Sequence, residues 1–225
     1  MKASVIIPCH NEGKRIIPII NEIKKSKLIR EIIIVDDGSD LYTKKILDSI
    51  RGIRLITHEK NLGKSAAIRS GVFEARSNIL LFLDSDITNF KTYHADAMLK
   101  EMADNNCDMI LGEWERDMFF SKLIGFSTAY TGQRAVYKNK LIRNVEIFDF
   151  GDYLLEPAMN KIFLNKSKTG IVILGNVGQV FKIQKSGIIG FLKDVGMWIS
   201  YVKFLGFREF TRQLSCARKL KYNSH

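Results

Sequence analysis

The sequence feature that most constrains the fold is a short apolar run that ends in acids, L-L-F-L-D-S-D at positions 80–86. Such a run, with Asn78 before it and two aspartates at its end, predicts a strand buried on both faces of a parallel sheet. Ligands of open α/β sheets bind beyond the carboxyl ends of the strands, so we expect Asp84 and Asp86 to line a ligand site. A D-x-D tripeptide alone also fits a solvated turn, and the neighbouring segments decide between the two.

The same order of strand, polar turn and helix recurs through the first half of the chain. We predict strands at residues 3–8, 31–35, 54–57, 80–84 and 108–111, and helices at residues 14–25, 44–50, 65–75 and 93–103. Strands and helices that alternate at this length predict an α/β fold with a mostly parallel, doubly wound central sheet flanked by helices. A length of 225 residues suits one such domain.

The pattern is less regular after Gly112. Residues 113–127 are rich in aromatic and charged side chains, and we expect them to form a connecting segment that covers the site. Beyond them the sequence predicts helices at residues 130–141 and 152–163 and strands at residues 170–174 and 179–183.

The last part of the chain is basic and has helical periodicity. From Lys182 onward, nine Lys or Arg stand against two acids, which gives +7 of the total net charge of +11. We therefore divide the chain into an α/β domain at residues 1–183 and a basic amphipathic helical tail at residues 184–225. The sequence allows two predictions for the tail. In the first, Trp198, Tyr201 and Phe204 contact an anionic membrane surface. In the second, the same apolar face packs on the sheet or in a dimer.

The net charge indicates an anionic partner but does not identify which kind. A net charge of +11 suits nucleic acid, an anionic membrane or a phosphorylated ligand. Acids at the strand ends would repel the phosphates of a nucleic acid, which disfavours a nucleic-acid-binding module. The three cysteines, Cys9, Cys107 and Cys216, are far apart and have no metal-binding spacing. With no secretion leader at the start, these features predict a cytoplasmic protein, peripheral on the membrane if the tail binds lipid.

Four motifs, in this order and each near the end of a predicted strand, resemble the family-2 glycosyltransferases of the GT-A fold. They are P-C-H-N-E at 8–12, D-D-G-S-D at 36–40, N-L-G-K at 61–64 and D-S-D at 84–86. The resemblance implies an enzyme that moves a sugar from a nucleoside-diphosphate sugar to an acceptor, with inversion at the anomeric carbon. It also implies dependence on Mg2+ or Mn2+. The base and the sugar of the donor stay open.

The resemblance also implies roles for residues in these motifs. Asp84 and Asp86 would bind the metal, and Asp86 would be catalytic through it, because a cation that bridges two phosphates stabilises the departing diphosphate. Asp37 would accept a hydrogen bond from the base or ribose, and such charge-assisted bonds are about twice as strong as neutral ones. The residues implied for the nucleotide-sugar pocket are Pro8, His10, Glu12, Asp37, Lys64, Asp84 and Ser85.

The acceptor side depends on a fifth motif, G-Q-R-A at 132–135. It is similar to the G-x-R-A element of the polyprenyl-phosphate sugar transferases, which implies that Arg134 meets the acceptor phosphate. A phosphate acceptor is already ionised and needs no general base, whereas a soluble or lipid hydroxyl acceptor needs one. Asp152 and Glu156, one turn apart in the predicted helix, are the candidates for that base. We favour a polyprenyl phosphate and keep the hydroxyl acceptor as the alternative.

Overall fold

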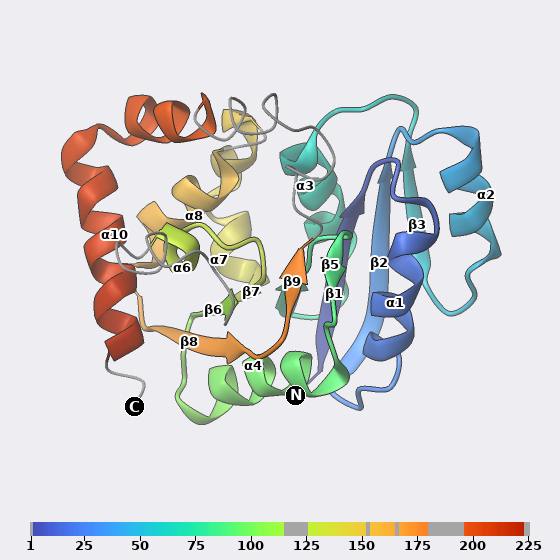
Figure 1. The fold of residues 1–225 in the computed structure, drawn as a ribbon, viewed down its shortest axis with the longest axis horizontal. Coiled ribbons are helices and arrows are strands. Elements are labelled where there is room, and N and C mark those ends of the chain that lie inside the picture. Colours follow the sequence, from blue (N-terminus) through green and yellow to red (C-terminus); the bar gives the residue numbers. More distant parts are fainter. Residues whose placement is uncertain (1, 115–125, 152–153, 165–166, 180–195, 223–225) are drawn as a thin grey trace.

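A computed structural model describes residues 2–114, 126–151, 154–164, 167–179 and 196–222. Its main feature is a seven-stranded sheet with the order β3-β2-β1-β4-β7-β6-β8 (Figure 1). All neighbouring strands are parallel except β7, which is antiparallel to both β4 and β6. The predicted mostly parallel α/β sheet is therefore confirmed. The strands are β1 Ala3–Cys9, β2 Ile29–Asp37, β3 Arg54–His58, β4 Ile79–Phe82, β6 Met109–Trp114, β7 Arg134–Tyr137 and β8 Thr169–Leu174.

Helices cover both faces of this sheet, and each face has its own apolar core. Along β1, Val5 and Ile7 belong to one core and Ile6 to the other, as alternation along a strand requires. The first core is covered by η1 Gly13–Ile16, α1 Ile17–Ile23, α2 Leu41–Ser49 and α4 Thr92–Asp104. The second is covered by α3 Lys64–Glu74, α7 Lys138–Ile142, η2 Val145–Phe150 and α8 Leu155–Phe163. Both faces are buried, which explains the nearly continuous apolar sequence of the central strands.

The predicted helix at residues 130–141 is wrong. Residues Arg134–Tyr137 form β7, which pairs with β4 on one side and β6 on the other, and only Lys138–Ile142 is helical. Without β7 the inner edges of β4 and β6 would carry unpaired backbone N–H and C=O groups within the sheet. Pairing with distant strands thus outweighs the local preference of this segment.

A second, smaller sheet holds the turn that contains Asp86. β5 Ile87–Thr88 follows Asp86 directly and pairs antiparallel with β9 Gly178–Gln179. The buried side chain of His94 on α4 contacts the same region, since its Nε2 lies 3.1 Å from the Gly175 carbonyl oxygen. The rest of the strand predicted at 179–183 lies outside the described residues, as do Asp152 and most of the connecting segment at 113–127.

Two helices at the C-terminal end pack on the domain. Residues 196–205 are helical, and α10 Phe207–Tyr222 follows after Gly206 (Figure 1). The side chains of Tyr201, Leu205, Gln213 and Ala217 are buried, so one face of the tail packs against the protein. Trp198, Ile199 and Phe207 are exposed. The predicted boundary at residue 183 falls among residues that are not described. In the described part of the chain, no helix is both long and apolar enough to cross a membrane.

Candidate active site

The first two motif loops meet beyond the carboxyl ends of β1 and β2, where Cys9 pairs with Asp36 in the sheet. Asn11 links them: its backbone N–H donates to Ser39 Oγ at 3.0 Å, and its Oδ1 accepts from the Asp40 N–H at 2.7 Å. Asn11 has a positive φ of 58°, which asparagine tolerates better than most residues. Asn11 was not among the predicted site residues, although an Asn in a loop after a strand is a signal for this conformation.

Asp37 joins the end of β2 to the end of β3 and the loop that follows it. Its carboxylate accepts hydrogen bonds from His58 Nδ1 at 2.7 Å, the Leu62 N–H at 3.0 Å and the Gly63 N–H at 2.7 Å. A carboxylate offers about four acceptor positions, and these contacts use three of them. Asp37 is buried, and its contact with a base or ribose stays a prediction. The contact of His58 with Asp37 was not predicted, because it depends on β2 and β3 being neighbours in the sheet.

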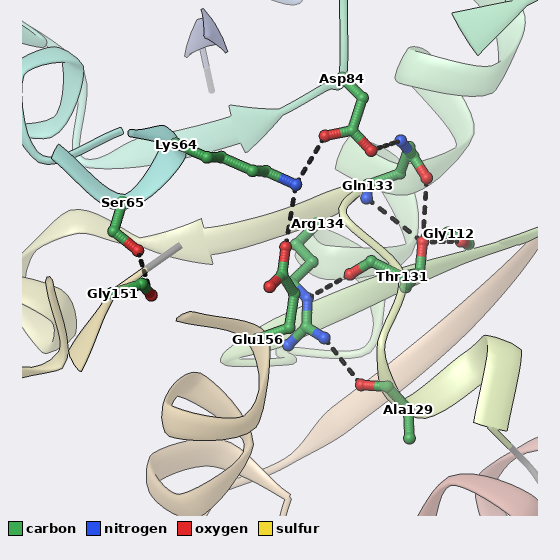
Figure 2. A network of polar contacts seen from close by, with 10 residues as sticks. All are labelled: Lys64, Ser65, Asp84, Gly112, Ala129, Thr131, Gln133, Arg134, Gly151 and Glu156. Carbon is green, nitrogen blue, oxygen red and sulfur yellow. Dashed lines mark hydrogen bonds and ion pairs between the residues drawn. The ribbon is translucent and has the colours of Figure 1, made fainter. Parts of the chain in front are cut away.

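Lys64, Asp84 and Glu156 form the charged centre of the site, which we call the Lys64 centre (Figure 2). Lys64 Nζ lies 2.7 Å from Asp84 Oδ1 and 2.9 Å from Glu156 Oε1. Burial alone would lower the pKa of Lys64, but the two carboxylates outweigh it and raise that pKa above its usual value. Lys64 is thus held as an ammonium, and it balances one of the two carboxylates that it contacts.

Residues 131–133 support Asp84. Gln133 Nε2 donates to Asp84 Oδ2 at 2.8 Å, and Thr131 Oγ1 lies 2.8 Å from the Gly112 carbonyl oxygen (Figure 2). A Cβ atom at Gly132 would lie only 2.4 Å from Asp84 Oδ2, so any other residue here would displace the Asp84 carboxylate. The G-Q-R-A motif therefore places a small residue and an amide against the aspartate that follows β4. Neither contact was predicted from the sequence.

Arg134 does not occupy the position expected of an acceptor-binding residue. Its side chain is 1% exposed, and its guanidinium donates to the carbonyl oxygens of Thr131 and Ala129, each at 2.7 Å, and to Asn160 Oδ1 at 2.8 Å. Burial lowers the pKa of Arg134 to about 10. The guanidinium is enclosed by protein oxygens and holds residues 129–134 in place. Arg134 thus has a structural role here, and its expected contact with an acceptor phosphate stays a prediction.

The other predicted residues lie around the same edge of the sheet. Pro8 is half-buried in β1, and the His10 ring contacts the Asp37 carbonyl oxygen through Nδ1 at 2.8 Å. Glu12 pairs with Arg15 at 2.7 Å. Ser85 and Asp86 form the turn between β4 and β5, with Ser85 buried and Asp86 half-buried.

The donor set after β4 fits a hard divalent cation. Asp84 and Asp86 supply two carboxylates one residue apart, and Mg2+ is commonly held by one or two carboxylates together with substrate phosphates. Within the described ranges, no three His, Cys, Asp or Glu side chains gather closely enough to hold a metal by themselves. The arrangement thus suits a cation completed by ligand phosphates.

Curated relatives match the chain over part of their length. Human dolichyl-phosphate beta-glucosyltransferase is 36% identical over 98 residues, covering 37% of this chain and 30% of the relative. Dodecaprenyl-phosphate galacturonate synthase of Rhizobium johnstonii is 23% identical over 164 residues, covering 67% of this chain and 46% of the relative. An uncharacterized protein of Methanocaldococcus jannaschii is 32% identical over 116 residues, covering 48% and 49%. The chain therefore spans half or less of the length of these relatives.

Solved structures share the fold. Glucosyl-3-phosphoglycerate synthase of Mycobacterium tuberculosis, in a complex with Mn2+, uridine diphosphate and glucosyl-3-phosphoglycerate, has a TM-score of 0.69 at 16% identity. The match covers 89% of this chain and 79% of that one. Staphylococcus aureus TarS has a TM-score of 0.62 at 19% identity and covers 76% and 58%. These similarities identify the GT-A fold.

The motif loops all lie within one matched region. The sequence profile described as glycosyl transferase family 2 matches residues 4–155, which include the loops after β1, β2 and β4 and the segment that supports Asp84. On this match, which covers more than half of the chain, the protein belongs to glycosyl transferase family 2.

Proposed function

We propose that the chain transfers a sugar from a nucleoside-diphosphate sugar to a polyprenyl phosphate, with Mg2+ or Mn2+ as the cofactor. The observation that carries the proposal is the Lys64 centre, which joins the start of α3, the turn after β4 and the first turn of α8 (Figure 2). It adjoins the end of β2, because the Gly63 N–H donates to Asp37. The names of two relatives, a dolichyl-phosphate glucosyltransferase and a dodecaprenyl-phosphate galacturonate synthase, support the acceptor class.

On the donor side, charged and polar groups are available for each part of a nucleotide sugar. The loops that contain His10 and Asp37 would hold the nucleoside, and Lys64 brings an ammonium to the diphosphate. Asp84 and Asp86 would hold the cation. When bound, the cation supplies stabilisation of the negative charge that builds on the departing diphosphate.

On the acceptor side, the environment of Glu156 favours an acceptor that is already ionised. Its Oε1 is engaged by Lys64 at 2.9 Å, so the carboxylate serves as an ion-pair partner. A phosphate oxygen needs no base to become a nucleophile. In the proposed reaction that oxygen forms a bond to the anomeric carbon, while the bond from this carbon to the diphosphate breaks on the opposite side. The configuration is thereby inverted.

A lipid acceptor places the site near a membrane, and the C-terminal helices offer a surface for this. Trp198, Ile199 and Phe207 are 45%, 50% and 74% exposed. The exposed basic residues Lys203 and Arg208 lie on the same two helices. Exposed aromatic residues beside Lys and Arg suit the interface of an anionic bilayer. We name Trp198, Ile199, Lys203, Phe207 and Arg208 the elbow surface, and we propose that it makes peripheral membrane contact.

The test is a transfer assay with UDP-, GDP- and dTDP-sugars, with and without Mn2+, on wild type and Asp86→Ala. Polyprenyl phosphate and the matching polyprenol serve as parallel acceptors. We expect Mn2+-dependent transfer to the phosphate from one class of nucleotide, lost in Asp86→Ala and retained in Asp149→Ala, an exposed carboxylate that pairs with Arg69. Transfer to the polyprenol alone would replace the phosphate acceptor by a hydroxyl. No binding or transfer with any nucleotide sugar would overturn the proposed function.

A further inference from the structure

The C-terminal helices reach the site through a buried polar network. Gln213 of α10 is fully buried, and its Nε2 donates to the Pro157 carbonyl oxygen at 3.2 Å. Its Oε1 accepts a hydrogen bond at 3.2 Å from Nδ2 of Asn160, which is also fully buried. A buried amide that is paired at both ends fixes its partners in place, because an unpaired polar group there would be costly. Gln213 thus ties α10 to α8, the helix that carries Glu156.

Asn160 extends this network to the segment that supports Asp84. Its Nδ2 donates to the Ala129 carbonyl oxygen at 2.7 Å, and its Oδ1 accepts from Arg134 Nη1 at 2.8 Å. Arg134 Nε donates in turn to the Thr131 carbonyl oxygen. Asn160 therefore connects α8, which carries Glu156, to residues 129–134, which support Asp84. The position of Asn160 is set from the far side by Gln213.

A second contact comes from the helix at residues 196–205. The buried Tyr201 ring lies 4.6 Å from the Tyr130 ring, between centroids, and Tyr130 adjoins the Asp84-supporting segment. Phe210 of α10 stacks on the same Tyr130 ring: the two ring centroids lie 6.0 Å apart, and the angle between the ring planes is 11°. Burial, and then the negative charge of Glu156, raise the pKa of Tyr201. Aromatic pairs of this kind add specific geometry to apolar burial.

We propose that Gln213 and Tyr201 are positioning residues for the Lys64 centre. The inference rests on the proposed function. Both residues lie beyond residues 4–155, the region that matches the family, so this support is a feature of this chain outside the matched motifs. Both act through residues 129–134 and α8, and neither needs to touch a substrate.

The first experiment compares Gln213→Leu with two controls on α10. Ala217→Gly is equally buried and weakens the helix without touching the polar network, and Thr211→Ala changes an exposed residue. We expect Gln213→Leu to lower kcat of the folded enzyme about tenfold or more, as small misplacements of catalytic groups do. Hydrogen exchange of residues 129–134 should become faster. Ala217→Gly should lower the melting temperature and leave both readouts unchanged.

The second experiment uses Tyr201 and does not depend on the folding of the Gln213 variant. Tyr201→Phe keeps the ring against Tyr130 and should restore most of the kcat that Tyr201→Ala loses. If both Gln213→Leu and Tyr201→Ala reduce only the melting temperature, as Ala217→Gly does, the two residues are merely structural and the inference is overturned. If wild type transfers no sugar, the proposed function fails. In that case hydrogen exchange remains a test. If Gln213→Leu leaves the exchange of residues 129–134 unchanged, the coupling of Gln213 to this segment is overturned.

Discussion

Lys64 forms ion pairs with two carboxylates that come from distant parts of the chain. Asp84 follows β4, whereas Glu156 lies in the first turn of α8. The sequence predicted Lys64, Asp84 and Glu156 individually, because each follows a recognisable strand or lies on a recognisable helix. It did not predict that Lys64 pairs with both, nor that Gln133 donates to Asp84. Such pairs depend on side-chain contacts between elements far apart in sequence, which spacing alone does not determine.

Replacing Lys64 by methionine should weaken both the site and the fold. Asp84 and Glu156 would remain half-buried or buried without the ammonium, and removing one partner of such a group is destabilising. The Lys64 side chain is 30% exposed, so we expect a loss of only about 1–2 kcal/mol in the free energy of unfolding. Urea denaturation at neutral pH measures this, and calorimetry with a nucleotide sugar should show affinity reduced about tenfold or more.

A surface lysine provides the control for this variant. Lys25 pairs with Glu22 at 2.6 Å, but the lysine side chain is 62% exposed. Lys25→Met should change the free energy of unfolding by no more than about 0.5 kcal/mol. Equal effects of the two substitutions would show that Lys64 contributes no more than an ordinary surface ion pair.

Gly132→Ala should disable Asp84 while the fold persists. The added Cβ would lie 2.4 Å from Asp84 Oδ2, so the carboxylate must move away from Lys64 or Gln133. We expect Mn2+-dependent nucleotide binding, measured by calorimetry, to fall at least tenfold, because carboxylate ligands tolerate little displacement. The matched control is Gly196→Ala, where the added Cβ meets nothing within 4 Å. If Gly132→Ala binds the nucleotide as wild type does, the close approach of Gly132 to the Asp84 carboxylate does not matter for binding.

At the scale of elements, the regular βα units were predictable and the exception was β7. β1, β2 and β4 contain nearly continuous apolar runs, and α1 places Ile19, Ile20 and Ile23 on its buried face as the periodicity predicts. β7 is only four residues long and is followed at once by α7. So short a strand has no period of its own, and its identity comes from the neighbouring strands that it pairs with.

The start of α4 should be sensitive to acid through His94. Its Nδ1 accepts the Lys91 N–H at 2.9 Å, and its Nε2 contacts the Gly175 carbonyl oxygen at 3.1 Å, so the neutral ring is required. Burial lowers the pKa of His94 below its usual 6.5. Between the lowered pKa and about 6.5 the unfolded state binds the proton and the folded state does not, so stability is lost as the pH falls below about 6.5.

Urea midpoints between about pH 7.5 and 5.5 measure this loss. His94→Gln keeps an acceptor and a donor but does not titrate, so its midpoint should fall less than that of wild type over the same range. Parallel pH dependence of the two proteins would assign the acid sensitivity to other groups. The other histidines are common to both proteins and cancel in the comparison.

At the scale of the whole molecule, the described part of the tail packs on the domain, and its contact with a membrane stays a proposal. One face of its helices is buried against α8 and residues 129–134, and the elbow surface is exposed. Of the three aromatic residues expected at a membrane, Tyr201 is buried, whereas Trp198 is exposed. Periodicity identified the tail as amphipathic. It could not assign faces, because residues on both faces of these helices are apolar.

Membrane contact through the elbow surface predicts a specific binding pattern. Wild type should sediment with vesicles that contain anionic lipid, and less with neutral vesicles or at high salt. Trp198→Ser combined with Phe207→Ser should weaken binding about tenfold or more by removing two exposed aromatic groups. Tyr42→Ser, which changes a residue 59% exposed on α2, should leave binding unchanged. If Tyr42→Ser loses as much vesicle binding as the double variant, the elbow surface is not the membrane contact.

The position of β7 also sets an order for the assembly of the protein as it is synthesised. Strands β1 to β4 lie within the first 82 residues and can pair with one another, but β6 has no neighbour among them in the final sheet. β6 joins only through β7, which is made later and inserts between β4 and β6. The residues just before β7 contact Asp84. Closure of the sheet and support of Asp84 thus depend on the same segment, and a nascent chain that lacks β7 carries the aspartates but not their support.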